Sequence, residues 1–319
     1  MIYLNGMLLA FLSPVTLNIF DDWWADIENG IKQLLIGGIK DCMSNIVSLL
    51  SGGMSSGNGL GDMVSTYISS SPSAIDSALW TNISTISKDV VTPIALTIVA
   101  IVSVSDMFQM VTSGNNMRDF DTSIFFKWIV KTEIALTLVG NAFNFVTLVF
   151  SEGATIASTA YTKIGVGALA SNKNLNTALQ ETLKDYTNSK LLVILGLSFV
   201  TMIAVYALFV AIMVTLCSRT IEAVMYLSVA PIPMATFMNN EFRQVGNSWA
   251  RGIFALAFQG FFIVVALAFF KSMFNGVTQD IVDKKDILFS MVKMCGYSVA
   301  LIFTVLRTGQ ISKTLFSAH

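Results

Sequence analysis

The sequence predicts an all-α protein: a polytopic membrane helix bundle with about five transmembrane helices, a proline-containing re-entrant segment and an N-terminal amphipathic helix. Three observations predict this class. Of the 319 residues, 54% are hydrophobic and only 12% are charged, whereas soluble domains carry about 25% charged residues. The mean hydropathy is +0.69. Several apolar stretches also approach the roughly 20 residues that cross a hydrocarbon layer of about 30 Å.

The composition argues against most enzyme classes and against nucleic acid as a main partner. The net charge is −1, whereas phosphate binding requires a basic face. The only histidine is His319, and Cys42, Cys217 and Cys295 are isolated, so no histidine-based metal site or catalytic pair can be assembled. The glycine-rich "SGGMSSGNGLG" lacks the ending of a phosphate-binding loop. We therefore expect no enzyme activity, no catalytic residue, no cofactor and no metal.

The N-terminal region, residues 1–50, contains an amphipathic helix. From Asp22 onward, apolar residues recur at spacings of three and four, with charged and amide side chains on the other face. The apolar face begins with Trp24, Ile27, Ile31, Leu34 and Leu35. Such a face suits a helix that lies along a bilayer surface or docks on another subunit. It equally suits a helix that packs on the rest of the chain.

Residues 51–73 are expected to form a linker, because "SGGMSSGNGLGD" consists mostly of glycine and serine. Residues 74–319 then form the polytopic membrane domain. Its clearest spans are Val90–Val111, Leu191–Cys217, Gly252–Phe270 and Ile287–Leu306. The polar segment 151–190 is expected to be an outer loop.

A fifth span, Ile124–Phe150, carries Lys127, Lys131 and Glu133 near its start. These charges lie within about two helical turns, so they can sit at a membrane interface while the remainder spans. Asp106 lies late in the first span, and a carboxylate in a membrane is usually functional or paired. It can pair across helices with the charged residues at the start of the fifth span. The favoured interpretation, however, is an interfacial belt of charge.

The sixth apolar segment, Ile221–Met238, contains Pro231 and Pro233, which interrupt helix geometry. A full crossing would place Arg219 and Arg243 on opposite sides of the membrane. A segment that dips in and returns places every arginine on one side, as the enrichment of basic residues in cytoplasmic loops favours. The re-entrant form is therefore favoured, and a proline-kinked full span is the alternative. The N-terminus and the outer loop are then outside, and the C-terminus is cytoplasmic.

The re-entrant segment and its flanks define a candidate cytoplasmic rim. Glu222 follows Arg219 at a spacing that permits an ion pair on one helix face. Trp249 next to Arg251 is typical of an aromatic and basic interface anchor. The predicted rim comprises Arg219, Glu222, Pro231, Pro233, Arg243, Trp249 and Arg251.

Three stretches carry a resemblance to a known family. They are "WTNISTISKDVVTPIALTIVAIVSVSDMFQMV", "DFDTSIFFKWIVKTEIALTLVGNAFNFV" and "YLSVAPIPMATFMNNEFRQVGNSWARGIFALAFQGF". Over roughly residues 75–310 the chain resembles TrbL-type membrane subunits of bacterial type IV secretion and conjugation systems, equivalent to the sixth VirB protein. The forms from Gram-positive conjugative elements look most similar. The most specific part is an apolar segment ending in Ala-Pro, then a polar turn with arginine, then a tryptophan and a long span.

The resemblance implies a multi-pass protein of the bacterial cytoplasmic membrane, with an outside N-terminus, about five spans and an inside C-terminus. It implies a non-enzymatic channel or scaffold subunit for conjugative DNA transfer. Its expected partners are copies of itself, other secretion subunits including ATPases, membrane lipid, and a transported DNA–relaxase or protein substrate. A secondary transporter or ion channel is the alternative function, although only one broken segment is found where transporters usually show two.

Overall fold

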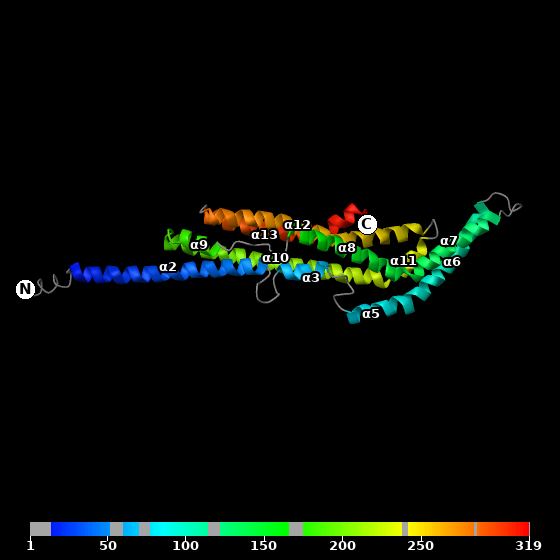
Figure 1. Ribbon diagram of the computed structural model, residues 1–319, viewed down its shortest axis with the longest axis horizontal. Helices are drawn as coiled ribbons and strands as arrows, with labels where there is room; N and C mark the ends of the chain where they lie inside the picture. Colours follow the sequence, from blue (N-terminus) through cyan, green and yellow to red (C-terminus); the bar gives the residue numbers. More distant parts are fainter. Residues whose placement is uncertain are drawn as a thin grey trace, which may run out of the picture.

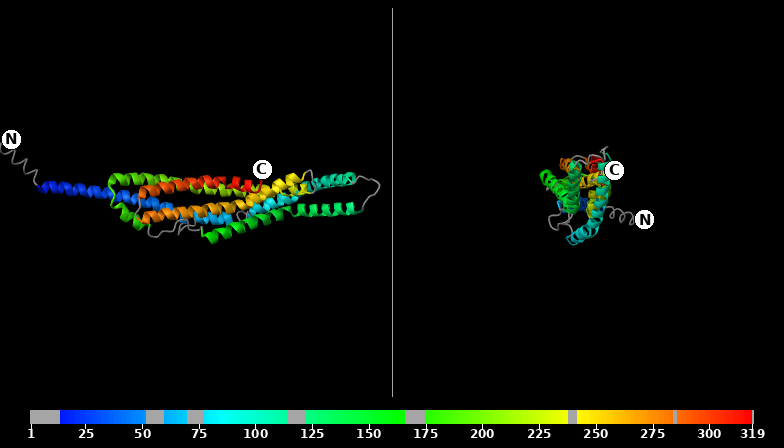
Figure 2. Two further views of the ribbon diagram at one scale, coloured as in Figure 1. Left: turned by 90° about the horizontal axis from the view of Figure 1, so that it is seen from above. Right: turned by 90° about the vertical axis from the view of Figure 1, so that its right-hand side faces the viewer.

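The computed structural model describes residues 14–51, 60–69, 77–113, 122–165, 175–237, 242–283 and 286–318. These residues form an elongated bundle in which the long helices run nearly parallel to its long axis (Figures 1 and 2). The described part contains helices and no strand, which confirms the all-α class.

The elements follow one another along the chain as helices of very different lengths. They are α2 (Pro14–Ser51), α3 (Leu60–Ser69), α5 (Ser77–Thr85), a π-helical turn (Ile86–Val91), α6 (Thr92–Ser113), α7 (Thr122–Gly140), α8 (Ala142–Ile164), α9 (Leu175–Leu183), α10 (Asn188–Ser228), α11 (Pro231–Thr236), α12 (Arg243–Val282) and α13 (Ile287–Leu315). The 41 residues of α10 extend about 60 Å at 1.5 Å per residue. This is twice the thickness of a hydrocarbon layer, so the bundle is longer than a membrane is thick.

Within the described residues, four helical segments are long and apolar enough to cross a membrane, or up to five if a bent pair counts as one span. The four are Ser77–Thr112, Asn188–Ser228, Arg243–Val282 and Ile287–Leu315. The bent pair joins α7 and α8, which meet at an angle of 63°. The prediction of about five apolar spans is thus confirmed, although Ile124–Phe150 is broken near its middle.

The break between α7 and α8 has a local cause. Gly140 and Asn141 are both poor helix formers, and Asn141 leaves helical geometry with φ −106° and ψ 10°. Its side-chain amide donates a hydrogen bond back to the carbonyl oxygen of Thr137 at 3.0 Å. An asparagine that bonds its own helix in this way competes with the regular backbone pattern.

Two hydrophobic cores lie one after the other along the bundle. The first core unites α2, α3, α9, α10, α12 and α13 with the end of α8, and Phe270 and Phe274 are among its largest buried side chains. The second core unites α5, α6, α7, α8 and α11 with the end of α10 and the start of α12, and it includes Phe150 and Trp249. Figure 1 shows α6 and α7 extending beyond the bundle at one end and α2 beyond it at the other.

The chain reverses direction between α10 and α12, with α11 at the turn. Residues 221–228 continue α10, and α11 has only six residues, about 9 Å of helix. Pro231 and Pro233 fall in the first turn of α11, where a missing backbone donor is tolerated. The segment 221–238 therefore does not form one spanning helix in its described part. The depth of this turn in a bilayer stays a prediction.

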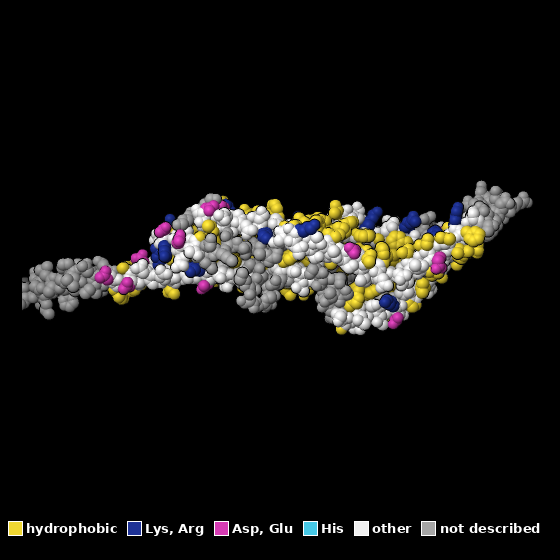
Figure 3. Space-filling view, in the orientation of Figure 1, with side chains coloured by type: hydrophobic (Ala, Val, Ile, Leu, Met, Phe, Trp, Pro, Cys, Tyr) yellow, Lys and Arg dark blue, Asp and Glu magenta, His cyan; other side chains and the backbone are white. Residues whose placement is uncertain are grey.

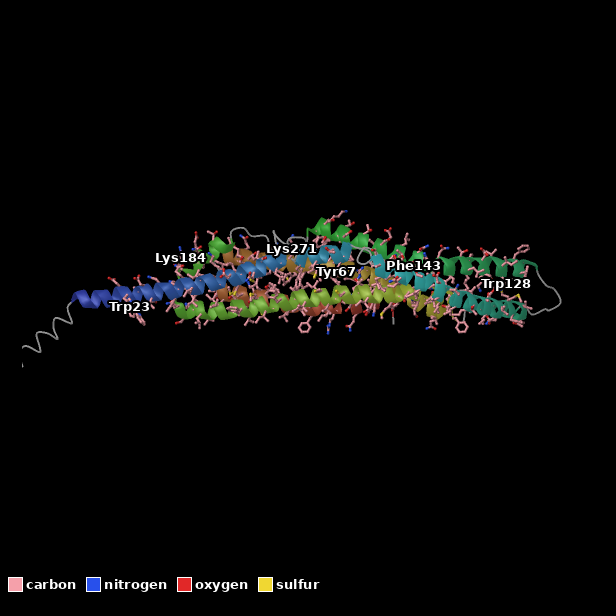
Figure 4. All side chains as sticks on the ribbon, turned by 90° about the horizontal axis from the view of Figure 1, so that it is seen from below. Trp23, Tyr67, Trp128, Phe143, Lys184 and Lys271 are labelled. Carbon is pink, nitrogen blue, oxygen red and sulfur yellow. The ribbon has the colours of Figure 1, made fainter. Side chains whose placement is uncertain are left out.

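The C-terminal half of α2 packs on α10 through a stripe of buried residues: Ile36, Ile39, Met43, Ile46 and Leu50. The predicted apolar face divides at this point. Trp24, Ile31 and Leu34 are exposed, whereas Leu35 contacts the first core. Ile27 is half-buried. Figure 4 shows Trp23 on the part of α2 that projects from the bundle. Packing on the rest of the chain thus explains the apolar face in the C-terminal half of α2 but not in its N-terminal half.

Two segments expected to be loops are partly helical. Within the expected linker 51–73, residues 60–69 form α3, whose Leu60, Val64 and Ile68 are buried at spacings of four. Within the expected loop 151–190, α8 continues to Ile164 and α9 follows. The short polar and small residues of these segments suggested loops, but small residues also permit close helix packing, and α8 buries several of them against α12.

Candidate functional site

The candidate site is a polar junction where α10 and α13 place side chains on the backbone of α12. The Nε of Arg219 donates to the carbonyl oxygen of Leu256 at 3.1 Å, and its Nη2 donates to that of Ala257 at 3.3 Å. The hydroxyl of Ser312 donates to the carbonyl oxygen of Ala255. Three consecutive carbonyls of α12 therefore accept side-chain hydrogen bonds from two neighbouring helices. We call Arg219, Ser312 and residues 255–257 the polar junction.

Small residues make the close approach at the junction possible. A Cβ added to Gly260 of α12 would lie 3.0 Å from Nη1 of Arg219. A Cβ added to Gly153 of α8 would lie 2.8 Å from the carbonyl oxygen of Ala257. Real Cβ atoms do not approach a backbone oxygen to 2.8 Å, so glycine at 153 lets α8 reach the α12 backbone. Glycine at 260 leaves room for the guanidinium group of Arg219.

Burial gives Arg219 an unusual role for an arginine. Only 8% of the residue is exposed, and the hydrogen bonds that the structure shows for it go to neutral carbonyls. A buried charge is costly unless hydrogen bonds and partners compensate for it. The predicted Arg219–Glu222 ion pair is not formed. The Oε2 of Glu222 instead lies 3.6 Å from the Nζ of Lys313 of α13, because the side chain of Arg219 turns inward toward α12.

The other predicted rim residues divide into an exposed and a buried group. Arg243 and Arg251 are exposed on the first part of α12. Pro231, Pro233 and Trp249 are buried. The anchor role expected for Trp249 fits this placement poorly, since its ring packs in the second core and its indole Nε1 has no hydrogen-bond partner among the described residues.

The described arginines lie in one half of the bundle. Arg219, near the end of α10, and Ser312, near the end of α13, both contact the first half of α12. These three segments therefore lie together. These segments carry Arg219, Arg243, Arg251 and Arg307, and we call this part the arginine half. Basic side chains are visible over it in Figure 3, between patches of hydrophobic surface.

A second polar contact joins α6 to α7. The Nζ of Lys131 lies 2.6 Å from Oδ2 of Asp106, whose residue is 3% exposed. Of the three charged residues named as possible partners of Asp106, Lys131 thus pairs with it, although a belt of charge was the favoured interpretation. Lys127 and Glu133 are exposed. Because one member of the ion pair is nearly buried, the two residues form a contact between helices and not a belt of exposed charges. This contact holds α6 and α7 in register, and we call these two helices the α6–α7 hairpin.

Further polar contacts extend this pairing along the hairpin. The hydroxyls of Ser103 and Thr132 lie 2.9 Å apart, and the indole of Trp128 donates to the carbonyl oxygen of Ser103 at 2.9 Å. Figure 4 shows Trp128 near the tip of the hairpin. Such contacts between helices satisfy polar groups that lipid cannot.

Sequence reasoning missed Gly153, Gly260 and Ser312 at the junction, and Ser103 and Trp128 on the hairpin. Gly252 and Gly260 lie eight residues apart on α12, a spacing that keeps two glycines on one helix face. That periodicity was the available signal for a close helix contact. For Ser312, a lone serine in a polar C-terminal segment gave no signal.

Together, these features define a polytopic membrane helix bundle with two hydrophobic cores and buried polar contacts between helices. In the described residues no group of three or more His, Cys, Asp or Glu side chains could hold a metal ion. Residues 58–231, more than half of the chain, match the family described as TrbL/VirB6 plasmid conjugal transfer like protein. The chain belongs to this family, and it is therefore a membrane subunit of the type IV secretion and conjugation class. Curated proteins and solved structures give no match.

Proposed function

We propose that this protein is a channel or scaffold subunit of a conjugative type IV secretion machine and that it acts by assembling with copies of itself and with secretion ATPases in the cytoplasmic membrane. The observation that carries the proposal is the large apolar surface that the chain leaves uncovered. In the most apolar window of Ser77–Thr112 only 28% is buried inside the chain, against 56% in Arg243–Val282.

The α6–α7 hairpin carries part of this uncovered apolar surface. Large exposed apolar side chains cover its outer faces: Ile101, Val104, Phe108, Phe125, Phe126, Ile129, Val130 and Ile134. A continuous exposed surface of large apolar side chains is expected to contact lipid or a neighbouring subunit. The internal Asp106–Lys131 ion pair supports the hairpin as a preformed unit, so an assembly can use it without refolding.

The arginine half supplies the second part of the mechanism. Arg243 and Arg251 are exposed on α12, next to the turn made by α11. Exposed arginines attract polyanions through a field that extends about 10 Å at ordinary salt. A DNA strand with its relaxase is such a polyanion. We therefore place these arginines at the cytoplasmic entrance of the transfer path.

The experiment is a mating assay in a donor that depends on this chain. The Arg243→Glu/Arg251→Glu double variant should lower transfer by at least tenfold while leaving membrane insertion unchanged. The matched control is Lys184→Glu/Lys190→Glu, two exposed lysines of the other half of the bundle, which should transfer normally. Equal transfer by both double variants would remove the arginines from the mechanism.

Copurification decides between this function and transport of a small solute. The purified assembly should contain a secretion ATPase and several copies of the chain. Substrate-dependent flux through liposomes that contain the chain alone, without copurifying ATPase, would favour a transporter or ion channel.

A further inference from the structure

An open groove runs between α12 and α13 at the side of the bundle. Its volume is about 440 Å³, and its lining comes from these two helices alone. The floor is formed by Phe270, Leu301 and Thr308, which are buried, whereas Val265 and Phe269 at the edge are exposed. The groove therefore faces outward from the bundle, toward whatever surrounds the two helices.

The groove offers an almost wholly apolar surface. Its two threonines satisfy their hydroxyls within their own helix, since Thr304 donates to the carbonyl oxygen of Ala300 and Thr308 to that of Val305. With these groups already bonded, a ligand in the groove is recognised by shape and by the burial of apolar area alone. An unbranched hydrocarbon chain meets this requirement.

A second pocket, which contains an arginine, continues the groove at one end. It is lined by Arg307, Gln310, Ile311, Thr314 and Leu315, and Ile311 is common to the pocket and the groove. Arg307 is exposed, and it takes part in none of the ion pairs that the structure shows among the described residues. The structure thus joins an apolar trough directly to an available guanidinium group, which is a preferred ligand for phosphate.

The distance from Arg307 to the far end of the groove, at Tyr297, matches the length of one lipid chain. Tyr297 and Arg307 are ten residues apart on α13, about 15 Å at 1.5 Å per residue. One leaflet of a hydrocarbon layer about 30 Å thick has the same depth, about 15 Å. A transmembrane helix from another subunit would be about 10 Å wide, which a groove of about 440 Å³ does not enclose.

We propose that the groove between α12 and α13 binds one acyl chain of an anionic phospholipid, with the lipid phosphate held by Arg307. The lipid chain fills the groove that α12 and α13 leave open between them. It also adds negative charge to an arginine half that otherwise carries basic side chains. The site is independent of the proposed role in secretion, because it concerns the bilayer that surrounds the chain.

Native mass spectrometry of the full chain tests the site. The protein is released from nanodiscs that hold equal amounts of phosphatidylglycerol and phosphatidylcholine, and retained lipids are counted. We expect the original chain to retain phosphatidylglycerol preferentially. Arg307→Gln should lower this preference about fivefold, because the lipid phosphate loses its charge-assisted hydrogen bonds to the guanidinium group. The control is Arg251→Gln, which removes an exposed arginine of α12 that lines neither the groove nor the pocket, and it should leave the preference unchanged.

A second pair of variants tests the acyl chain. Ala300→Phe places a ring in the groove and should abolish retention of either lipid. Ala207→Phe, at an exposed site on α10, should not. Retention by Ala300→Phe equal to that of the original chain would overturn the proposal, as would an unchanged headgroup preference in Arg307→Gln. The Arg307→Gln result decides by itself if Ala300→Phe fails to fold.

A cysteine at Phe269 distinguishes lipid from protein. In a variant that lacks Cys42, Cys217 and Cys295, Phe269→Cys should stay monomeric under oxidation. A disulfide-linked dimer through this cysteine would show that a second copy covers the groove, and the lipid proposal would be wrong.

Discussion

The Nε of Arg219 lies 3.1 Å from the carbonyl oxygen of Leu256, so a buried guanidinium group of α10 is bound to the backbone of α12. Hydrogen bonds from a charged donor are worth about 1.5–3 kcal/mol each. Burying the charge costs several kcal/mol in return. The two effects nearly cancel, and this balance decides what a substitution at Arg219 does.

We expect Arg219→Met to change the free energy of unfolding by less than about 1 kcal/mol, because methionine fills the space of the alkyl stem and brings no charge to desolvate. Arg219→Ala should lose about 2–4 kcal/mol, since it leaves a cavity between α10 and α12. Thermal unfolding in detergent, followed by circular dichroism, compares the two. Equal destabilisation by both variants would show that the hydrogen bonds dominate.

Gly153 should tolerate no side chain, in contrast to Gly276. A Cβ at position 153 would lie 2.8 Å from the carbonyl oxygen of Ala257, whereas a Cβ at position 276 would meet no atom within 4 Å. Gly153→Ala should therefore destabilise the bundle by about 1–3 kcal/mol, as overpacking does. Gly276→Ala should stabilise it by up to about 1 kcal/mol through helix propensity.

The same unfolding assay measures both glycine variants. Gly276→Ala is the matched control, because it makes the same chemical change within a long helix. A Gly153→Ala variant as stable as the original chain would mean that α8 and α12 separate easily at this contact.

Asp106 and Lys131 should behave as a coupled pair. Lys131→Met leaves a carboxylate that is nearly buried without its partner and should cost about 3–5 kcal/mol. Asp106→Asn should cost less, since Lys131 is partly exposed and can reach the interface. The double variant should recover about 1–3 kcal/mol of the summed loss. A double-mutant cycle of unfolding free energies measures this coupling, and additive losses would argue against an ion pair.

The class of fold could be predicted from the sequence because several uncharged hydrophobic runs of spanning length are typical of membrane proteins and rare in soluble ones. The sequence also pointed to Asp106 and to the charged start of α7, since charges stand out in such runs. It did not reveal which partner Asp106 takes, because Lys127, Lys131 and Glu133 all lie within about two turns of α7 and only the packing of α6 on α7 selects among them.

The polar junction could not be predicted for a related reason. Backbone carbonyls carry no sequence signal, so nothing in the chain indicates that residues 255–257 accept side-chain hydrogen bonds. Arg219 was expected to pair locally with Glu222, because the spacing of residues along one helix can be seen in a sequence. A contact with a distant helix cannot. The α7–α8 bend likewise depends on how Asn141 bonds to Thr137, within a run that is apolar enough to span.

The arrangement of the helices allows a direct test of orientation. The N-terminal half of α2 and the start of α12 lie toward opposite ends of the bundle (Figure 1). If the arginine half is cytoplasmic, as basic residues in cytoplasmic flanks favour, then Glu28 is outside and Gln244 is inside. Both residues are exposed, so a cysteine at either position should be reactive wherever reagent reaches it.

In intact cells, in a variant without Cys42, Cys217 and Cys295, we expect a membrane-impermeant maleimide to label Glu28→Cys and not Gln244→Cys. Permeabilised cells serve as the control, because both cysteines should then label. Labelling of Gln244→Cys alone in intact cells would invert the orientation. Since the arginines would then face away from the cytoplasm, their proposed place at the entrance of the transfer path would be wrong, while the family and the fold would stand.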